Sequence, residues 1–112
     1  MKSDTPYIQQ VCDAIKKIAA YAVDMTYEQF CADDKTQSAV IMQLIIIGEL
    51  TKKISLDTKH QIDLPWKDIA GFRDVAVHEY FHLDLEIVWN TIGERLPEIR
   101  EKLCSDKPSF IS

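Results

Sequence analysis

The chain is poor in the residues that punctuate a β-rich fold and in long apolar runs. Three glycines and four prolines in 112 residues leave little material for the many tight turns that short strands require. The most apolar run, 40–47, falls far short of the roughly 20 residues that a membrane-spanning helix needs. The composition therefore favours a few long helices and excludes a membrane span.

Cysteine is also scarce, and its three copies form no recognisable pair. Cys12, Cys31 and Cys104 are odd in number and widely spaced, which argues against both a disulfide framework and a structural zinc site. We expect helix-embedded thiols in a reducing compartment. The first six residues lack an apolar signal segment, so a cytoplasmic location is predicted.

Positive charge is in deficit. Thirteen Lys and Arg stand against 18 Asp and Glu, giving a formal net charge of −5. This disfavours a protein that coats nucleic acid non-specifically, because such binding depends on many contacts between basic side chains and phosphates. A small local basic site is still compatible with it. The length predicts one domain over 1–112, with 105–112 as a frayed tail.

Apolar residues recur at helical spacing along most of the sequence. Each stripe is typical of a helix with one face in a core, and together they predict an all-α, up-and-down bundle of four to five helices. The helix at 36–55 is apolar around much of its circumference, which places it at the centre. The other stripes cover 5–24, a short segment after Thr26, 64–82 and 84–103.

Several local signals place the helix ends. Thr26 and Gln29 have the spacing of a capping box, and Thr36 is expected to cap the central helix. The polar stretch 57–63 is expected to be a loop. Gly48 costs about 1 kcal/mol relative to Ala inside a helix, so we expect another helix to pass close to it.

Two motifs overlap between residues 73 and 82. Arg73, His78 and Tyr80 form Arg-x4-His-x-Tyr, the signature of HEPN-type ribonucleases. His78, Glu79 and His82 form His-Glu-x-x-His, the signature of zinc proteases. Each motif fixes only three residues, so the rest of the chain has to decide between them.

The first motif has the chemistry of metal-free RNA cleavage. His78 can act as general base on a ribose 2′-OH or as acid on the leaving oxygen. Arg73 can bind the phosphate and stabilise developing charge, and Asp74 could orient either group. Tyr80 offers a hydroxyl on the Arg73 face. The alternative is a solvated Arg73–Asp74 pair, a helix-end histidine and a packing tyrosine.

The spacing of the first motif motivates a dimer. Arg73 and Tyr80 share one face of a helix, but His78 lies roughly 140° around the helix from Arg73. Either the helix loosens after His78 or a second copy of the chain completes the site. A symmetric dimer would bring two arginines and two histidines into one cleft.

Longer segments resemble the HepT toxins, a branch of the HEPN superfamily. The run 65–81 resembles their motif region, and 39–50 resembles their "IIGEA"-like helix. Val88-Trp89 and Leu96-Pro97 match their C-terminal helix, so the resemblance spans about 5–104. It implies an HEPN-like bundle that dimerises around a composite active site, with Arg73 and His78 as the catalytic pair.

The resemblance also implies an activity and a partner. The activity would be that of a type II toxin: a metal-independent endoribonuclease without a cofactor that leaves 2′,3′-cyclic phosphates on RNA. The partner would be an MntA-type nucleotidyltransferase antitoxin that transfers AMP to Tyr80. The added charge and bulk would block the cleft beside Arg73.

The sequence departs from the family pattern at three places. Asp74 stands where Asn is frequent, which puts a negative charge beside the phosphate-binding arginine. Gln37 stands where Arg is common, and Leu50 where Ala is common. Glu49 could support Arg73 or His78, or could instead act in a cap or a surface ion pair.

Two other functions are left open. A zinc hydrolase would use His78 and His82 as ligands, with Glu101 downstream as a third, but it needs a substrate-binding strand that the pattern does not predict and leaves Arg73 unexplained. A non-catalytic subunit that presents substrates to a nucleotidyltransferase would also suit the acidic balance.

Overall fold

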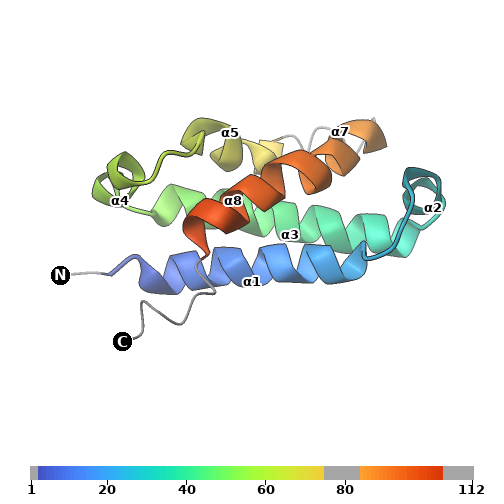
Figure 1. Ribbon diagram of the computed structural model, residues 1–112, viewed down its shortest axis with the longest axis horizontal. Helices are drawn as coiled ribbons and strands as arrows, with labels where there is room; N and C mark the ends of the chain where they lie inside the picture. Colours follow the sequence, from blue (N-terminus) through green and yellow to red (C-terminus); the bar gives the residue numbers. More distant parts are fainter. Residues whose placement is uncertain (1–2, 75–83, 105–112) are drawn as a thin grey trace.

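The computed structural model describes residues 3–74 and 84–104. Every regular element within these ranges is helical, which confirms the predicted all-α bundle (Figure 1). In chain order the elements are α1 (Thr5–Tyr21), α2 (Tyr27–Cys31), α3 (Asp34–Lys53), α4 (Leu56–Gln61), α5 (Trp66–Ala70), α7 (Leu85–Asn90), the π-helical turn η1 (Thr91–Arg95) and α8 (Leu96–Leu103).

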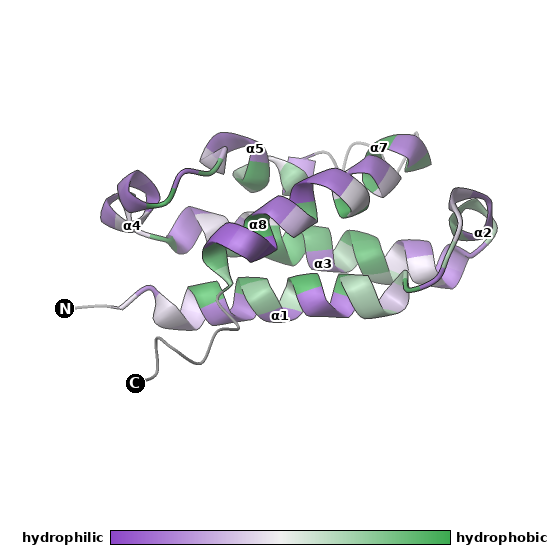
Figure 2. Ribbon diagram, viewed as in Figure 1, coloured by the Kyte–Doolittle hydropathy of each residue, from purple (hydrophilic) through white to green (hydrophobic). Residues whose placement is uncertain are grey.

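Helix α3 lies at the centre of the bundle, as its sequence predicted. It packs against α1, α2 and α5, while α8 covers part of α1. Figure 2 shows apolar residues on the facing sides of α1 and α3 and mostly hydrophilic residues on the outer surface of α8. None of the described helices is both long and apolar enough to cross a membrane. The buried core includes Val11, Ile15, Ile18, Phe30, Val40, Leu44, Ile47, Ile69, Phe72, Val88 and Ile99.

The starts of α2 and α3 show what local sequence signals can predict. The capping box is confirmed, because the Gln29 amide donates to Thr26 Oγ1 and the Thr26 amide donates to Gln29 Oε1. The cap predicted at Thr36 is wrong, since α3 begins after Asp33. The Asp33 carboxylate accepts both the Thr36 backbone N–H at 3.0 Å and its hydroxyl at 2.7 Å, and these bonds lower the pKa of Asp33. A carboxylate can accept both donors at once, whereas a Thr36 cap would leave them unused.

Gln37 joins the short helix to the central one. Its buried side-chain amide donates to the carbonyl oxygens of Phe30 at 2.8 Å and Cys31 at 3.1 Å. These bonds satisfy carbonyls at the C-terminal end of α2, which have no partner within the helix. The residue that departs from the family pattern at this position therefore has a structural role.

The predicted loop at 57–63 is wrong, because its first part is helix α4. Ser55 caps α4 through the Thr58 amide, and Asp4 accepts hydrogen bonds from the hydroxyls of Ser55 and Thr58. These two bonds lower the pKa of Asp4. At the other end, the Trp66 indole N–H donates to the carbonyls of Lys59 and Ile62 at 3.0 Å each. The helix buries no residue of its own, so its sequence carried no apolar stripe.

The helix predicted over 64–82 is interrupted. Pro65 immediately precedes α5, which ends at Ala70; Gly71 is a turn residue, and helical backbone resumes at Phe72. Arg73 therefore belongs to a new helical segment rather than to α5. The predicted end of this helix and the predicted frayed tail at 105–112 lie outside the described residues.

The expectation of three free thiols is also wrong. Cys12 of α1 and Cys104 after α8 form a disulfide, with Cα atoms 5.7 Å apart across 92 residues of sequence, and Cys31 is free and exposed. The pairing follows from the packing of α8 against α1, which counts and spacings do not reveal. The argument for a reducing compartment from unpaired cysteines therefore does not hold.

The last long helix is irregular just before Pro97. Residues 91–95 form a π-helical turn, and α8 continues from Leu96. Proline removes one backbone N–H and its ring crowds the carbonyl four residues earlier, here that of Gly93. The wider π turn, which lies immediately before α8, accommodates this conflict.

Candidate active site

Gly48 is the point at which α3 and the Arg73 segment touch. A Cβ atom added at Gly48 would lie 2.9 Å from the Arg73 backbone nitrogen, 3.1 Å from the Ala70 carbonyl oxygen and 3.2 Å from Arg73 Cβ. Real Cβ atoms essentially never come within 3.0 Å of such neighbours. The close approach that was predicted at Gly48 is confirmed, and its partner is the backbone that carries Arg73.

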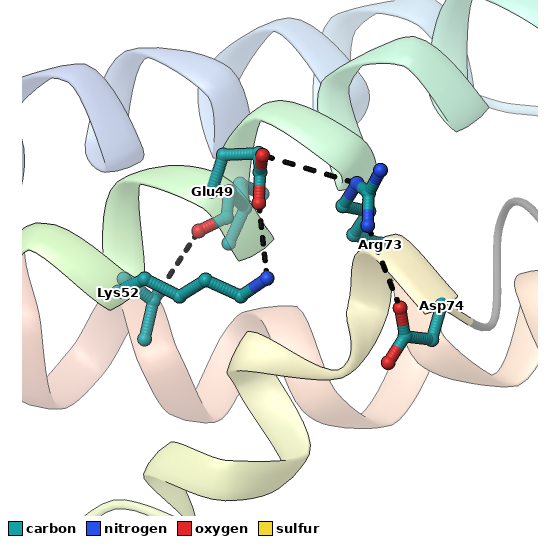
Figure 3. A network of polar contacts seen from close by, with 6 residues as sticks. Glu49, Lys52, Arg73 and Asp74 are labelled. Atoms are coloured by element: carbon teal, nitrogen blue, oxygen red, sulfur yellow. Dashed lines mark hydrogen bonds and ion pairs between the residues drawn. The ribbon is translucent and has the colours of Figure 1, made fainter.

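Arg73 lies in a small network of exposed charges (Figure 3). Its Nε is 3.8 Å from Glu49 Oε1, and its Nη1 is 3.8 Å from Asp74 Oδ1. Glu49 also pairs with Lys52, at 3.2 Å. Glu49 directly follows Gly48 on α3. The contact between Gly48 and the Arg73 backbone therefore also places the Glu49 carboxylate beside the Arg73 side chain.

The exposure of this network suits ligand binding more than stability. The side chains of Arg73 and Glu49 are 46% and 50% exposed, and ion pairs of this kind contribute at most about 1 kcal/mol to folding. At 3.8 Å the two carboxylates attract the guanidinium without saturating its five N–H donors. Such a group can bind a phosphate in a bidentate manner.

The network also balances charge around the arginine. Arg73 and Lys52 are offset by Glu49 and Asp74, and a phosphate bound at the terminal nitrogens of the guanidinium would compete with Asp74, which contacts Nη1. Asp74 is the more exposed of the two carboxylates, at 70%. The departure from Asn to Asp at this position therefore places its charge where it opposes an anionic ligand.

Three of the five predicted site residues lie together in the described structure. Arg73, Asp74 and Glu49 form the network, whereas His78 and Tyr80 lie outside the described residues, as does the His-Glu-x-x-His motif. Lys52 joins this network through its contact with Glu49, which the i, i+3 spacing along α3 allows.

A second feature near this site was not predicted. A cavity of about 530 Å³ opens between α3, α5, α7 and η1, and Phe72, the residue before Arg73, lines it. Two sequence features could have indicated this cavity. Gly71 and the occurrence of Gly93 four residues before Pro97 both mark irregular backbone beside it.

Comparison with known proteins identifies the family. The family model described as ribonuclease HepT-like matches residues 11–105, which include Gly48, Glu49, Arg73 and the whole motif region. The chain belongs to the ribonuclease HepT-like family. Membership agrees with the resemblance seen in the motif and in the "IIGEA"-like helix.

Individual relatives of the HepT-like chain cover nearly its full length. A probable ribonuclease HepT of Thermococcus cleftensis is 36% identical over 102 residues, or 90% of this chain and 93% of the relative. Proteins named as RNases from Methanocaldococcus jannaschii and Caldanaerobacter subterraneus are 35% and 31% identical, covering 85% and 92% of this chain and 80% and 93% of the relatives. No solved structure matches with comparable significance.

Proposed function

We propose that this HepT-like chain is a metal-independent endoribonuclease that acts as the toxin of a type II toxin–antitoxin pair. The observation that carries the proposal is the position of Arg73. Its backbone packs against Gly48 of α3, and its exposed guanidinium lies beside Glu49. The family match and the names of the relatives support RNA as the substrate. RNA and the proposed ATP-dependent partner are both cytoplasmic, which supports that location.

The proposed reaction uses Arg73 and His78. His78 accepts the proton of a ribose 2′-OH, and the 2′ oxygen forms a bond to phosphorus while the bond from phosphorus to the 5′ oxygen breaks. Arg73 binds the non-bridging oxygens and stabilises their charge as it increases. The leaving 5′ oxygen takes up a proton, and the products are a 2′,3′-cyclic phosphate and a 5′-hydroxyl.

We assign Glu49 and Asp74 as supporting residues with opposite effects. Glu49 contacts Arg73 Nε, away from the terminal nitrogens, so it can hold the guanidinium plane without occupying the edge that faces a ligand. Asp74 contacts Nη1 and therefore competes with the phosphate. Glu49 supports catalysis in this assignment, while Asp74 limits affinity.

A homodimer with a composite active site is part of the proposal. On one helix Arg73 and His78 point about 140° apart, and a two-fold related copy supplies the missing partner at each site. Sedimentation at assay concentrations tests this: a fully active monomer would exclude the composite site.

The proposed partner is an MntA-type nucleotidyltransferase antitoxin that transfers AMP from ATP to the Tyr80 hydroxyl, releasing pyrophosphate. Tyr80 is seven residues from Arg73, a spacing that corresponds to two turns on one face of a continuous helix. An AMP group there adds a negative phosphate beside the guanidinium and excludes RNA. Incubation of the two proteins with ATP should add one or more AMP masses to the chain and abolish cleavage.

Two alternatives make different predictions. A non-catalytic subunit of a nucleotidyltransferase pair would bind its partner but cleave no RNA. A zinc hydrolase using His78 and His82 is disfavoured by the family assignment, and an equivalent of tightly held zinc per chain would revive it.

The deciding experiment is RNA cleavage by purified protein in excess EDTA, beside Arg73→Ala and His78→Ala. We expect cleavage in EDTA that leaves cyclic phosphates, and a loss of about 100- to 1,000-fold in each variant, as for removal of one transition-state donor elsewhere. Arg73 is half exposed, so its variant should keep the melting temperature of the parent. No cleavage by a chain of unmodified mass would favour the binding subunit.

A further inference from the structure

The cavity beside the proposed active site has the form of a ligand pocket. Its volume of about 530 Å³ lies within the range of roughly 300–1,000 Å³ typical of small-molecule sites. Figure 1 shows α5 and α7 on the same side of α3, and the cavity is lined by residues of all three helices and of η1.

The floor of the cavity is formed by buried apolar side chains. Leu44, Phe72 and Val88 line it and are 2%, 7% and 1% exposed. Ile87 also lines the cavity but is 42% exposed, so it lies toward the solvent side. A flat apolar group entering here would cover Ile87 and pack against the floor.

Among the described residues, the rim of the cavity is polar but electrically balanced. Lys67 and Arg95 carry positive charge, and Asp68 and Glu94 carry negative charge. A site for a bare phosphate would need an excess of positive charge. A balanced rim suits a group that is neutral overall and has both hydrogen-bond donors and acceptors.

Two uncharged side chains extend this capacity. The Asn90 amide at the rim can both donate and accept hydrogen bonds. The Thr91 hydroxyl donates to the Ile87 carbonyl oxygen at 2.9 Å, and a hydroxyl oxygen that donates can still accept a hydrogen bond. A nucleobase edge, with donors and acceptors in one plane, matches this set.

The backbone around the rim is irregular where these side chains arise. Thr91, Glu94 and Arg95 all lie in the π-helical turn, and single π turns are frequent at functional sites. The wider turn changes the angular spacing of its side chains relative to an α-helix. The conflict at Pro97 therefore shapes the rim of the cavity.

The cavity and Arg73 lie within reach of one RNA strand. Phe72 lines the cavity and is bonded directly to Arg73. Along α3, Leu44 on the floor and Glu49 beside Arg73 are five residues apart, or about 7.5 Å along the axis. A nucleotide whose base entered the cavity could place an adjacent phosphate at Arg73.

We propose that this cavity binds one unpaired base of the RNA substrate, next to the phosphate held at Arg73. The assignment rests on the proposed ribonuclease function and adds to it a requirement for a single-stranded nucleotide. Proteins that recognise RNA by sequence bind bases splayed out of single strands, pack them against apolar side chains and hydrogen-bond their edges. The apolar floor and mixed rim provide both.

The test uses equilibrium binding of a short single-stranded RNA to the His78→Ala protein, which holds the strand without cutting it. Replacing one nucleotide at a time by an abasic one should reveal a single position that weakens binding by about 5- to 100-fold, as loss of one base contact does. In an Ile87→Trp variant, whose indole obstructs the mouth, binding should weaken by a similar factor and the abasic effect should disappear. Asn90→Ala should weaken binding without obstructing the floor.

Leu56→Trp is the matched control, because Leu56 is also exposed and apolar but lies on α4. It should bind RNA as the parent does. If no abasic position matters and Ile87→Trp binds normally while the parent chain still cleaves RNA, the base pocket is refuted and the ribonuclease stands. If no RNA is cleaved or bound, both proposals fail. Free AMP or UMP that binds as tightly as the RNA, and is lost in Ile87→Trp, would overturn the assignment to substrate.

Discussion

Two glycines lie within helical segments of the described structure, and their surroundings are opposite. Gly48, on the central helix, has the Arg73 backbone so close that a Cβ atom would meet its nitrogen at 2.9 Å. Around Gly93, in the π-helical turn, no described residue outside its own turn comes within 4 Å of where its Cβ would lie. Each glycine costs its helix about 1 kcal/mol relative to Ala. Only at Gly48 does packing account for that cost.

The missing side chain has a different consequence at each of the two glycines. At Gly48 the absence of a side chain allows two backbones to meet, and the meeting fixes where Arg73 lies. At Gly93 the open space belongs to the π-helical turn before Pro97, whose Thr91, Glu94 and Arg95 line the cavity. The contact at Gly48 therefore positions the Arg73 side chain, whereas the turn around Gly93 leaves unfilled space.

Removing the disulfide should have the largest effect on stability while leaving the Gly48 contact intact. Cys12→Ser opens a crosslink that spans 92 residues, and loss of such a bond typically costs about 2–5 kcal/mol of unfolding free energy. Denaturant unfolding measures the loss. RNA cleavage at a temperature where the variant is folded should match the parent, and an unchanged denaturation midpoint would show that the crosslink contributes nothing.

Filling the contact at Gly48 should cost less stability but more activity. In Gly48→Ala the crowding of two backbones costs about 1–3 kcal/mol, and the better helix propensity of Ala returns about 1 kcal/mol. Arg73 must move, and a displacement of about 1 Å can lower cleavage up to 100-fold. A variant with the parent's rate would mean that Arg73 does not depend on this contact.

Replacing Gly93 by alanine should raise the free energy of unfolding, whereas the same change at Gly48 lowers it. Gly93→Ala meets open space and should stabilise the fold by about 0.5–1 kcal/mol through the lower entropy of the unfolded chain. Cleavage should not change. A lower melting temperature would show that the π-helical turn requires glycine for its backbone geometry.

Charge removal beside Arg73 should change catalysis with little change in stability. Glu49→Gln should alter the unfolding free energy by less than about 1 kcal/mol, because both partners are half exposed, and should lower the turnover rate several-fold as the guanidinium loses its holding contact. Asp74→Asn is the matched variant and should lower KM instead. Equal kinetics in Glu49→Gln and the parent would remove Glu49 from the site.

The smallest effect is expected far from both glycines, at Asp4. Its pKa is lowered by hydrogen bonds from Ser55 and Thr58, so its contribution to stability is present above the unfolded pKa of about 3.8 and is lost as pH falls through the folded value. The difference in melting temperature between the parent and Asp4→Asn should therefore become smaller as the pH drops from about 5 to about 3. RNA cleavage at neutral pH should be the same in both proteins. A constant difference in melting temperature would contradict this.

The parts of the fold that local chemistry determines could be predicted from sequence. The Thr26–Gln29 box involves residues three apart, and the unusual glycine at 48 indicated a close neighbour without naming it. The cap of α3 was misplaced because Asp33 and Thr36 are both good caps, and the choice depends on how many bonds each side chain can accept.

The parts that depend on distant neighbours could not be predicted. Cys12 and Cys104 are separated by 92 residues, and α4 is held by Asp4 and Trp66 rather than by an apolar stripe of its own. The cavity requires α3, α5 and α7 to be in place together. The contact between Arg73 and Glu49 was one of several roles open to Glu49, and only the packing at Gly48 selects it.

The most direct test of the account is the rate of RNA cleavage in Gly48→Ala divided by that in Cys12→Ser, both measured in EDTA where circular dichroism shows them folded. If the Gly48 contact positions the phosphate-binding arginine, Gly48→Ala will be about 10- to 100-fold slower, although Cys12→Ser is the less stable protein. Equal rates in the two variants would contradict the claim that Arg73 owes its position to Gly48.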